Sequence, residues 1–378
     1  MRPSPFPIAV AVLMLTGCAT STTPSAPATP TATTASSSDA RAVRADLDGL
    51  VHAGAVGALA TLTEGDRTIT LATGSANIAT GTPMPTDPPQ HVRIGSVTKT
   101  FTAAVVLQLV AEGKVALDTP IDTYLPGLLS GQGIDGKVIT VRELLQHRSG
   151  LPELTEDPEI DEYKAAQTGR IFTPAEEIAI ALRRPAQFPP GTRTKYTNTN
   201  FIVAGMLIER VTGDSYGNEV QRRILTPLGL TGTYLPPAGE VDLRDPHPVG
   251  YATIDGKQTD TTRVEPSIPW SGGAMVSTGA DLNRFFIALL NGKVVAGDQL
   301  RQMLTGAPLD EMPGLNYGLG LMSAPLACGA QYAGHTGGIT GFSTISGATR
   351  EGRAVTIAMT GEVGMPDLKA LLAHALCP

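Results

Sequence analysis

Hydrophobic and polar positions give the chain two textures, with strand-like patterns towards both ends and helical patterns in the middle. Residues 42–53 carry apolar side chains at helical spacing, and the strand-like runs 56–63 and 68–73 flank a polar turn, so they predict a helix followed by a β-hairpin. Residues 97–112 are apolar on most sides and stop at Gly113, which predicts a buried helix.

Further helical segments fill the middle of the chain, and strand patterns return near its end. The helical segments are residues 141–146, 174–184, 200–211, 216–225, 280–290 and 299–304. The later strands are residues 318–322, 331–334, 342–347 and 354–360, before a last helix at 366–376. Separate runs of strand and helix predict an α+β fold, in which the terminal strands pair in one antiparallel sheet flanked by helices and an all-helical domain is inserted.

One folded domain is therefore expected over residues 41–378. Its α/β part covers 41–105 and 270–378, and the helical insertion covers 106–269. Because pockets concentrate where two parts of a fold meet, we expect a functional site at this seam.

The first 40 residues have the composition of an export signal followed by a linker. Arg2 precedes the apolar run 8–15, which is too short to span a bilayer and ends in Leu15-Thr16-Gly17-Cys18. These residues resemble a bacterial lipobox, which implies that residues 1–18 are a lipoprotein signal with lipid carried on Cys18. An ordinary secretory signal is the alternative. Both place the folded part outside the cytoplasm, anchored to the cell membrane or secreted.

Composition limits the partners of the protein. Residues 19–40 are almost entirely Ser, Thr, Pro and Ala, which predicts a disordered tether. The net charge of −7 and the lack of a long Lys/Arg cluster argue against a nucleic-acid surface. The absence of C-x-x-C and H-E-x-x-H patterns argues against a metal site, and we expect no cofactor. We expect a monomer that meets the membrane only through its lipid anchor.

Ser96-Val97-Thr98-Lys99 is the first candidate for chemistry. Ser96 is the only Ser three residues before any of the eight Lys. It opens the buried helix, where unpaired N–H groups lie beside it, and the spacing puts Lys99 one turn along on the same face. A Lys in a partly apolar slot can take the hydroxyl proton and make Ser96 a nucleophile. The alternative is a helix-capping Ser with a solvated Lys.

Two further motifs follow at the junctions between helical and strand segments. In Tyr196-Thr197-Asn198, a Tyr near a cation can ionise below its normal pKa and serve as a base, and the Asn amide can bind a substrate amide. In His335-Thr336-Gly337-Gly338, the glycines allow a ligand to lie against the backbone. The alternatives are a packed Tyr with a helix-start Asn, and a glycine-rich turn with an incidental His.

Taken together, these motifs resemble those of the penicillin-recognising serine hydrolases: D-alanyl-D-alanine carboxypeptidases, above all the exocellular actinomycete ones, class C β-lactamases and related esterases. The likeness extends from about residue 45 to the C-terminus. Its further segments are residues 145–151, 197–201, 271–273, 281–282 and 317–320.

This resemblance implies a β-lactamase/transpeptidase-like fold and an acyl-enzyme at Ser96. Lys99 and Tyr196 would share the transferred proton, with Tyr196 activating the deacylating water, and the N–H groups of Ser96 and Gly338 would hold the oxyanion. Asn198 would bind the substrate amide, together with the segment that begins at His335. Trp270, the only Trp, would wall the site or else lie in the core.

In an exported chain the two remaining cysteines, Cys328 and Cys377, are free to form a disulfide; two buried thiols are the alternative. The expected activity is that of a D-Ala-D-Ala carboxypeptidase on cell-wall peptides, acylated by β-lactams. A β-lactamase or esterase with the same machinery, transfer to an amine, and a sensor that binds without turnover stay open. Residues 322–327 carry no charge, and Gly338 replaces a residue that often bears a hydroxyl. Because a carboxypeptidase must bind a free carboxylate, both features favour an esterase or a D-amino-acid amidase.

Overall fold

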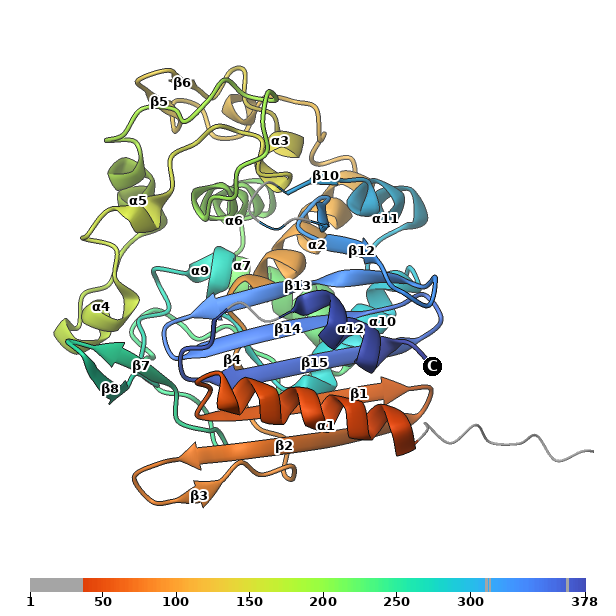
Figure 1. The fold of residues 1–378 in the computed structure, drawn as a ribbon. Coiled ribbons are helices and arrows are strands. Elements are labelled where there is room, and N and C mark those ends of the chain that lie inside the picture. The colour runs from red at the N-terminus through yellow and green to blue at the C-terminus, as the bar shows by residue number, and fades with distance from the viewer. Residues whose placement is uncertain (1–36, 310–311, 313, 365–366) are drawn as a thin grey trace, which may run out of the picture. The chain divides into compact units, whose positions relative to one another are not determined.

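The structure is a computed structural model that describes residues 37–309, 312, 314–364 and 367–378. Predictions on residues 1–36, including the signal, Cys18 and most of the tether, lie outside the described residues. Within them, nine strands form an antiparallel sheet in the order β10-β11-β12-β13-β14-β15-β1-β2-β3 (Figure 1). The strands are β1 (Gly57–Glu64), β2 (Arg67–Asn77), β3 (Thr82–Pro83), β10 (Ala307–Pro308), β11 (Asn316–Tyr317), β12 (Met322–Pro325), β13 (Gln331–Ile339), β14 (Phe342–Ala348) and β15 (Arg353–Thr360).

The first and last long strands of the chain are neighbours in this sheet, as the sequence predicts. β1 pairs with β15 from Gly57 opposite Thr360 to Glu64 opposite Arg353. β1 and β2 form the predicted hairpin. The sheet is therefore assembled from segments almost 300 residues apart, and everything between them is built around it.

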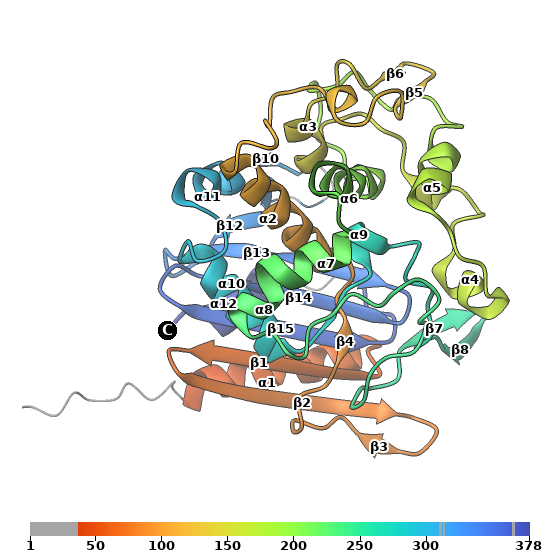
Figure 2. The ribbon, with the colours of Figure 1, turned by 180° about the vertical axis from the view of Figure 1, so that it is seen from behind.

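Helices cover both faces of the sheet. α1 (Ser37–His52) and α12 (Leu368–Leu376) lie on one face, and α10 (Gly279–Leu290) and α2 (Thr98–Ala111) lie on the other (Figures 1 and 2). Because side chains alternate along a strand, Ala58 and Ala60 belong to the core under α1 and α12, whereas Leu59 belongs to the opposite core.

The remaining helices confirm most of the predicted helical segments, and the prediction of an all-helical insertion is wrong. They are α3 (Val141–Leu145), α4 (Glu162–Thr168), α5 (Pro174–Ala181), α6 (Thr199–Thr212), α7 (Tyr216–Val220), α8 (Thr226–Leu228), α9 (Trp270–Gly273) and α11 (Gly297–Leu304). The insertion also carries two short hairpins, β5 (Ser130–Gly131) with β6 (Ile134–Asp135) and β7 (Tyr251–Ile254) with β8 (Lys257–Asp260). Hairpins this short leave no periodicity to detect.

Several boundaries differ from the prediction for local physical reasons. α1 begins at Ser37, inside the last residues of the predicted tether, because a polar first turn carries no hydrophobic period. Residues 318–321 of the predicted strand form a turn between β11 and β12, where the Gly318 N–H donates to the Leu321 carbonyl at 2.8 Å. A loop after β12 is tied to the end of α12 by a disulfide between Cys328 and Cys377, the pair named from the sequence.

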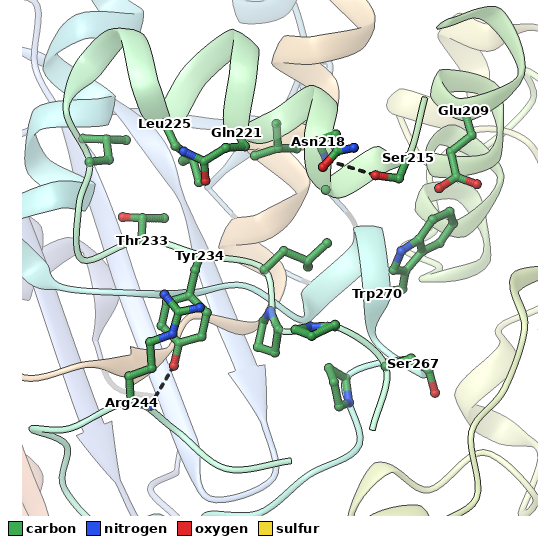
Figure 3. A pocket seen from close by; sticks show the side chains of 18 of the residues that line it. Glu209, Ser215, Asn218, Gln221, Leu225, Thr233, Tyr234, Arg244, Ser267 and Trp270 are labelled. Carbon is green, nitrogen blue, oxygen red and sulfur yellow. Dashed lines mark hydrogen bonds between the residues drawn. The ribbon is translucent and has the colours of Figure 1, made fainter. Parts of the chain in front are cut away.

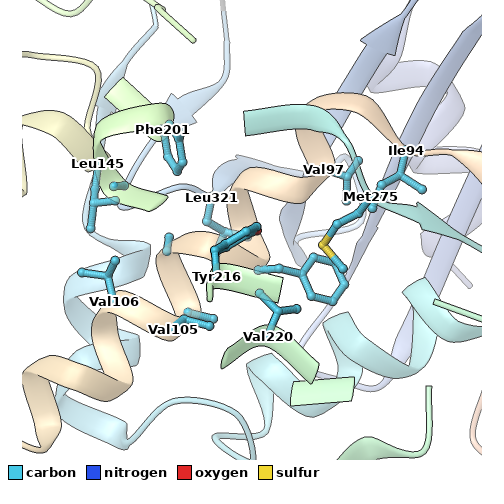
Figure 4. Close-up of a cluster of buried hydrophobic side chains, with 14 of the residues drawn as sticks. Ile94, Val97, Val105, Val106, Leu145, Phe201, Tyr216, Val220, Met275 and Leu321 are labelled. Atoms are coloured by element: carbon cyan, nitrogen blue, oxygen red, sulfur yellow. The ribbon is translucent and has the colours of Figure 1, made fainter. Parts of the chain in front are cut away.

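The predicted buried helix, α2, lies in the larger hydrophobic core. Val105 and Val106 of α2 are fully buried there, and so is Phe201 of α6. Figure 4 shows these three residues packed with Leu145 and Tyr216. No helix among the described residues is long and apolar enough to cross a bilayer. Because α2 is enclosed on all sides, the residues of its first turn are held in fixed positions.

Candidate active site

Ser96 stands in a short 3₁₀ turn, η1 (Gly95–Val97), that leads directly into α2. A helix-capping Ser was the alternative from the sequence, but the residue at the N-cap of α2 is Val97, and no side chain caps that end. Gly95 has φ of 49°, and a Cβ there would come within 2.7 Å of the Gly338 nitrogen. Glycine is thus required twice over, by conformation and by the close approach of β13 to the turn.

Lys99 lies one helical turn beyond Ser96 and is completely buried. Its Nζ bonds to Ser96 Oγ at 3.0 Å, to Asn198 Oδ1 at 2.7 Å and to the Gly272 carbonyl at 2.7 Å. Burial lowers the pKa of Lys99 to about 7, and the field of Glu153 raises it by a smaller amount. A large fraction of Lys99 is therefore neutral near pH 7.

A neutral amine at this position has a defined orientation. It has two N–H donors and one lone pair, and two of its three partners are carbonyl oxygens that only accept. The two N–H groups therefore point to Asn198 and Gly272, and the lone pair is left for the hydroxyl of Ser96. This is the geometry of a base ready to take the proton of Ser96.

Asn198 lies at the start of α6 with both ends of its amide engaged. Its Oδ1 accepts from Lys99, while its Nδ2 donates to Glu153 Oε1 at 3.1 Å and its backbone N–H to Glu153 Oε2 at 2.6 Å. Oδ1 keeps a second lone pair and Nδ2 keeps a second N–H, so a substrate amide can bind Asn198 in the way predicted without breaking these bonds. Glu153 was not among the residues singled out from the sequence, since a lone acid in a loop carries no pattern.

Tyr196 brings its ring to 5.0 Å from Lys99 Nζ and packs on His147, with the two ring centroids 4.1 Å apart. Its Oη is buried and has no hydrogen-bond partner of good geometry among the described residues. Burial raises the pKa of Tyr196, and the nearby Ser96 hydroxyl offsets part of that rise. The expectation that Tyr196 ionises below its normal pKa is therefore wrong, because desolvation outweighs the effect of the Ser96 hydroxyl.

His335 is a neutral side chain inside β13. Its Nδ1 lies 2.5 Å from the Thr336 carbonyl and must donate to it, so Nε2 accepts from the Tyr317 hydroxyl at 3.0 Å. Burial lowers the pKa of His335 to about 3. Both ring nitrogens are occupied, and a contact from a protonated His335 to a substrate carboxylate would require an unfavourable charge in a buried place.

The end of β13 runs along the turn that carries Ser96. The predicted strand stopped at Gly334, but β13 continues through Thr336, Gly337 and Gly338. A Cβ on Gly337 would lie 2.0 Å from the Ile94 carbonyl, whereas one on Gly338 would meet nothing within 4 Å. The glycines thus let a strand, and not a turn, press against the nucleophile, and Gly338 faces open space.

Trp270 opens α9, two residues before Gly272, whose carbonyl accepts from Lys99. It forms part of a cavity of about 710 Å³ between α7 and the segments around Tyr234 and Ser267 (Figure 3), and its ring meets Tyr216 edge-on. The lining does not include Ser96, Lys99 or Tyr196. The structure thus brings together Ser96, Lys99, Tyr196 and Asn198 beside the β13 glycines. The Trp270 ring packs against the larger hydrophobic core, which is the alternative named from the sequence, and it also lines this cavity.

A Ser–Lys pair at the mouth of a buried helix, next to an antiparallel sheet, is the arrangement of a serine hydrolase that forms acyl-enzymes. The family model described as Beta-lactamase matches residues 40–376, and the chain belongs to this family.

Solved structures and curated proteins similar to this chain carry hydrolase and penicillin-binding names. A D-stereospecific amidohydrolase from Streptomyces sp. is 35% identical with a TM-score of 0.82, over 89% of this chain and 98% of that one. A D-amino acid amidase from Ochrobactrum anthropi is 29% identical with a TM-score of 0.74, over 86% and 92%. A putative penicillin-binding protein, PbpX of Bacillus subtilis, is 28% identical over 70% of this chain and 60% of its own length. Penicillin-binding protein 4 of Amycolatopsis lactamdurans is 31% identical over 60% and 57%. The chain thus spans less than two thirds of these two curated relatives.

Proposed function

We propose that this protein hydrolyses amides and esters of D-amino acids through an acyl-enzyme at Ser96. The observation that carries the proposal is the bonding of Lys99: two carbonyl oxygens take its N–H groups and leave its lone pair for Ser96 Oγ. A base in contact with a hydroxyl at this spacing is what nucleophilic catalysis by serine needs.

Acylation begins when neutral Lys99 takes the proton of Ser96 and Oγ bonds to the substrate carbonyl carbon. The carbonyl oxygen, now an anion, lies between the N–H groups of Ser96 and Gly338, each worth roughly 3–4 kcal/mol of barrier. The Tyr196 hydroxyl protonates the leaving amine as the C–N bond breaks, and Lys99 returns a proton to Tyr196. In deacylation Lys99 takes a proton from water, and the water oxygen bonds to the acyl carbon. The ester bond to Ser96 then breaks, and Lys99 returns the proton to Ser96 Oγ.

The lack of charge on β13 supports amides and esters as substrates over peptides with a free carboxylate. Binding a carboxylate needs a cation, and both nitrogens of His335 are engaged and uncharged. The 35% identity to a D-stereospecific amidohydrolase supports the D-amino-acid class. The D-Ala-D-Ala carboxypeptidase expected from the sequence stays a second candidate, supported by the penicillin-binding relatives.

A substrate panel tests the proposal. Purified protein and Ser96→Ala are compared on a D-amino-acid amide, its L isomer, a D-Ala-D-Ala peptide, a chromogenic cephalosporin and a short-chain nitrophenyl ester. We expect turnover of the D-amide and the ester, little of the free-acid peptide, and none with Ser96→Ala. Equal turnover by Ser96→Ala would contradict the role of Ser96, and preference for the peptide would restore the carboxypeptidase. A stable cephalosporin adduct without turnover would favour the sensor.

We also propose that the protein is exported and anchored through Cys18, which lies outside the described residues. The disulfide between Cys328 and Cys377 supports an oxidising compartment. Cell fractionation of the parent and Cys18→Ala, with an alkyne-tagged fatty acid, tests this: label and membrane fraction should disappear together. Label retained by Cys18→Ala would exclude this anchor.

A further inference from the structure

The amide of Asn198 has two ends of almost the same size, and only one of them is useful next to Lys99. Its oxygen accepts an N–H of Lys99 and turns the lone pair towards Ser96, whereas its NH2 group would compete for that lone pair. Something must therefore decide which end faces Lys99.

Glu153 fixes the orientation of this amide through two hydrogen bonds to Asn198. Oε2 accepts the backbone N–H of Asn198 at 2.6 Å, and Oε1 accepts its Nδ2 at 3.1 Å. A carboxylate only accepts, so it can face the NH2 end and cannot face the oxygen end. The amide oxygen is thereby directed to Lys99 Nζ, 2.7 Å away.

The carboxylate is itself held rigidly in its loop. Oε1 also accepts the backbone N–H and the hydroxyl of Thr155, each at 2.9 Å, and so caps the 3₁₀ turn Leu154–Glu156. On either side of it, the Pro152 carbonyl accepts the Thr199 hydroxyl at 2.6 Å, and the Leu154 N–H donates to that hydroxyl at 3.1 Å. The loop after α3 is therefore fastened to the start of α6 around the Glu153–Asn198 pair.

We propose that Glu153 is a positioning residue of this active site, which holds the Asn198 amide with its oxygen towards Lys99 and so aims the lone pair of Lys99 at Ser96. The inference rests on the proposed role of Lys99 as the base. Glu153 also adds a charge near Lys99. The other titratable groups facing Lys99 are Tyr196, His147 and His335; burial raises the pKa of the first and lowers the pKa of the two histidines, so all three are neutral near pH 7.

Glu153→Gln removes the charge and keeps the shape, and the probe is the hydrolysis of a short-chain nitrophenyl ester from pH 5 to 9. We expect kcat/KM to fall by roughly 10- to 100-fold, since small misplacement of a catalytic group is enough for such losses. We also expect the acid limb of the profile, near pH 7 in the parent, to move to lower pH, because the carboxylate raises the pKa of Lys99. Glu156→Gln, an exposed acid in the same turn, is the matched control and should change neither.

A double-mutant cycle with Asn198→Ala separates this role from general support of the fold. If Glu153 acts through Asn198, adding Glu153→Gln to Asn198→Ala should produce almost no further loss in kcat/KM. Losses that multiply, or a loss without movement of the acid limb, would mean that Glu153 only stabilises its loop. Parental activity in Glu153→Gln would also overturn the inference. Failure of the proposed function is distinct, since it appears as ester turnover by Ser96→Ala.

Discussion

Ser96 lies between two groups of residues that are built in opposite ways, called here the helix side and the strand side. The helix side, made of Lys99, Asn198 and Glu153, is charged, and its members are joined by hydrogen bonds of 2.6 to 3.1 Å. The strand side, made of β11 and β13, offers the neutral His335, the ring of Tyr317 and the backbone of two glycines. Tyr196 stands between them with its hydroxyl unpartnered among the described residues.

The difference separates two tasks. Hydrogen bonds fix where a proton is taken, so the helix side can hold a base in one orientation. Neutral rings and bare backbone provide shape and N–H donors without a charge that would attract the base or its proton. A free phenol between them can serve the leaving group, because no stronger partner competes for it.

Removing the base should have the largest effect and would break the helix side. Lys99→Met is expected to lower kcat/KM on the D-amide by about 10,000-fold, the upper range for a general base. Lys195→Met, which changes a partly exposed Lys next to Tyr196, is the control and should stay near the parent. Activity in Lys99→Met within tenfold of the parent would show that another group takes the proton.

Tyr196→Phe tests the group between the two sides. It should lower kcat/KM by about 1,000-fold, as loss of a general acid does, while Tm stays within a few degrees because no hydrogen bond of good geometry is lost. Tyr332→Phe is the mirror control: its hydroxyl donates to the Ser346 carbonyl at 3.0 Å, so Tm should fall while activity stays. A large fall in Tm for Tyr196→Phe would contradict a free phenol.

Two adjacent glycines test the strand side. Gly337→Ala places a Cβ 2.0 Å from the Ile94 carbonyl and must push β13 off the nucleophile turn, so we expect about a 100-fold loss in kcat/KM. Gly338→Ala meets open space and keeps its N–H, so the expected loss is under about fivefold. Equal effects of the two variants would show that close approach of β13 does not matter.

The smallest expected effect is on stability and concerns a buried acid outside the candidate site. This acid, unlike Lys99, is buried without hydrogen-bond partners among the described residues. Glu177 in α5 is fully buried, neither oxygen has a partner among the described residues, and burial raises its pKa. An acid whose pKa is raised by folding destabilises the fold increasingly as pH rises above its unfolded value. Glu177→Met should therefore raise the free energy of unfolding at pH 8 by about 1–2 kcal/mol, with little gain near pH 4.

Denaturant unfolding at the two pH values measures this difference. The neighbouring Glu176→Met is the control, because Glu176 closes the capping box of α5 and its loss should destabilise the protein. A gain for Glu177→Met that is the same at pH 4 and pH 8 would mean that ionisation of Glu177 is not the cause.

Local sequence patterns predicted the helices that carry the site residues better than the contacts between those residues. Residues 97–112 are apolar on most sides and predicted a buried helix, and α2 is buried. This prediction succeeds because a helix buried on all sides needs apolar residues around its whole circumference. The predicted strand ended at Gly334, before the glycines that follow His335. In the structure the strand continues through these glycines, and they allow it to approach Ser96, which only the fold reveals.

Long-range pairing explains what was missed or reversed. Glu153 lies 45 positions from Asn198, and neither residue hints at the other in the sequence. The protonation of Tyr196 was reversed because its burial depends on His147 and Tyr317, which arrive from other segments. Motifs therefore named the Ser96–Lys99 pair that the fold brings into hydrogen-bonding contact, while the protonation state of each group depends on tertiary packing.

The pairing of β1 with β15 has a consequence for how the protein is made. The centre of the sheet cannot form until Thr360 is available to Gly57, so the ribosome must release nearly the whole polypeptide before this β-structure closes. The newborn chain consequently spends its synthesis without a completed core, a condition compatible with the export proposed above.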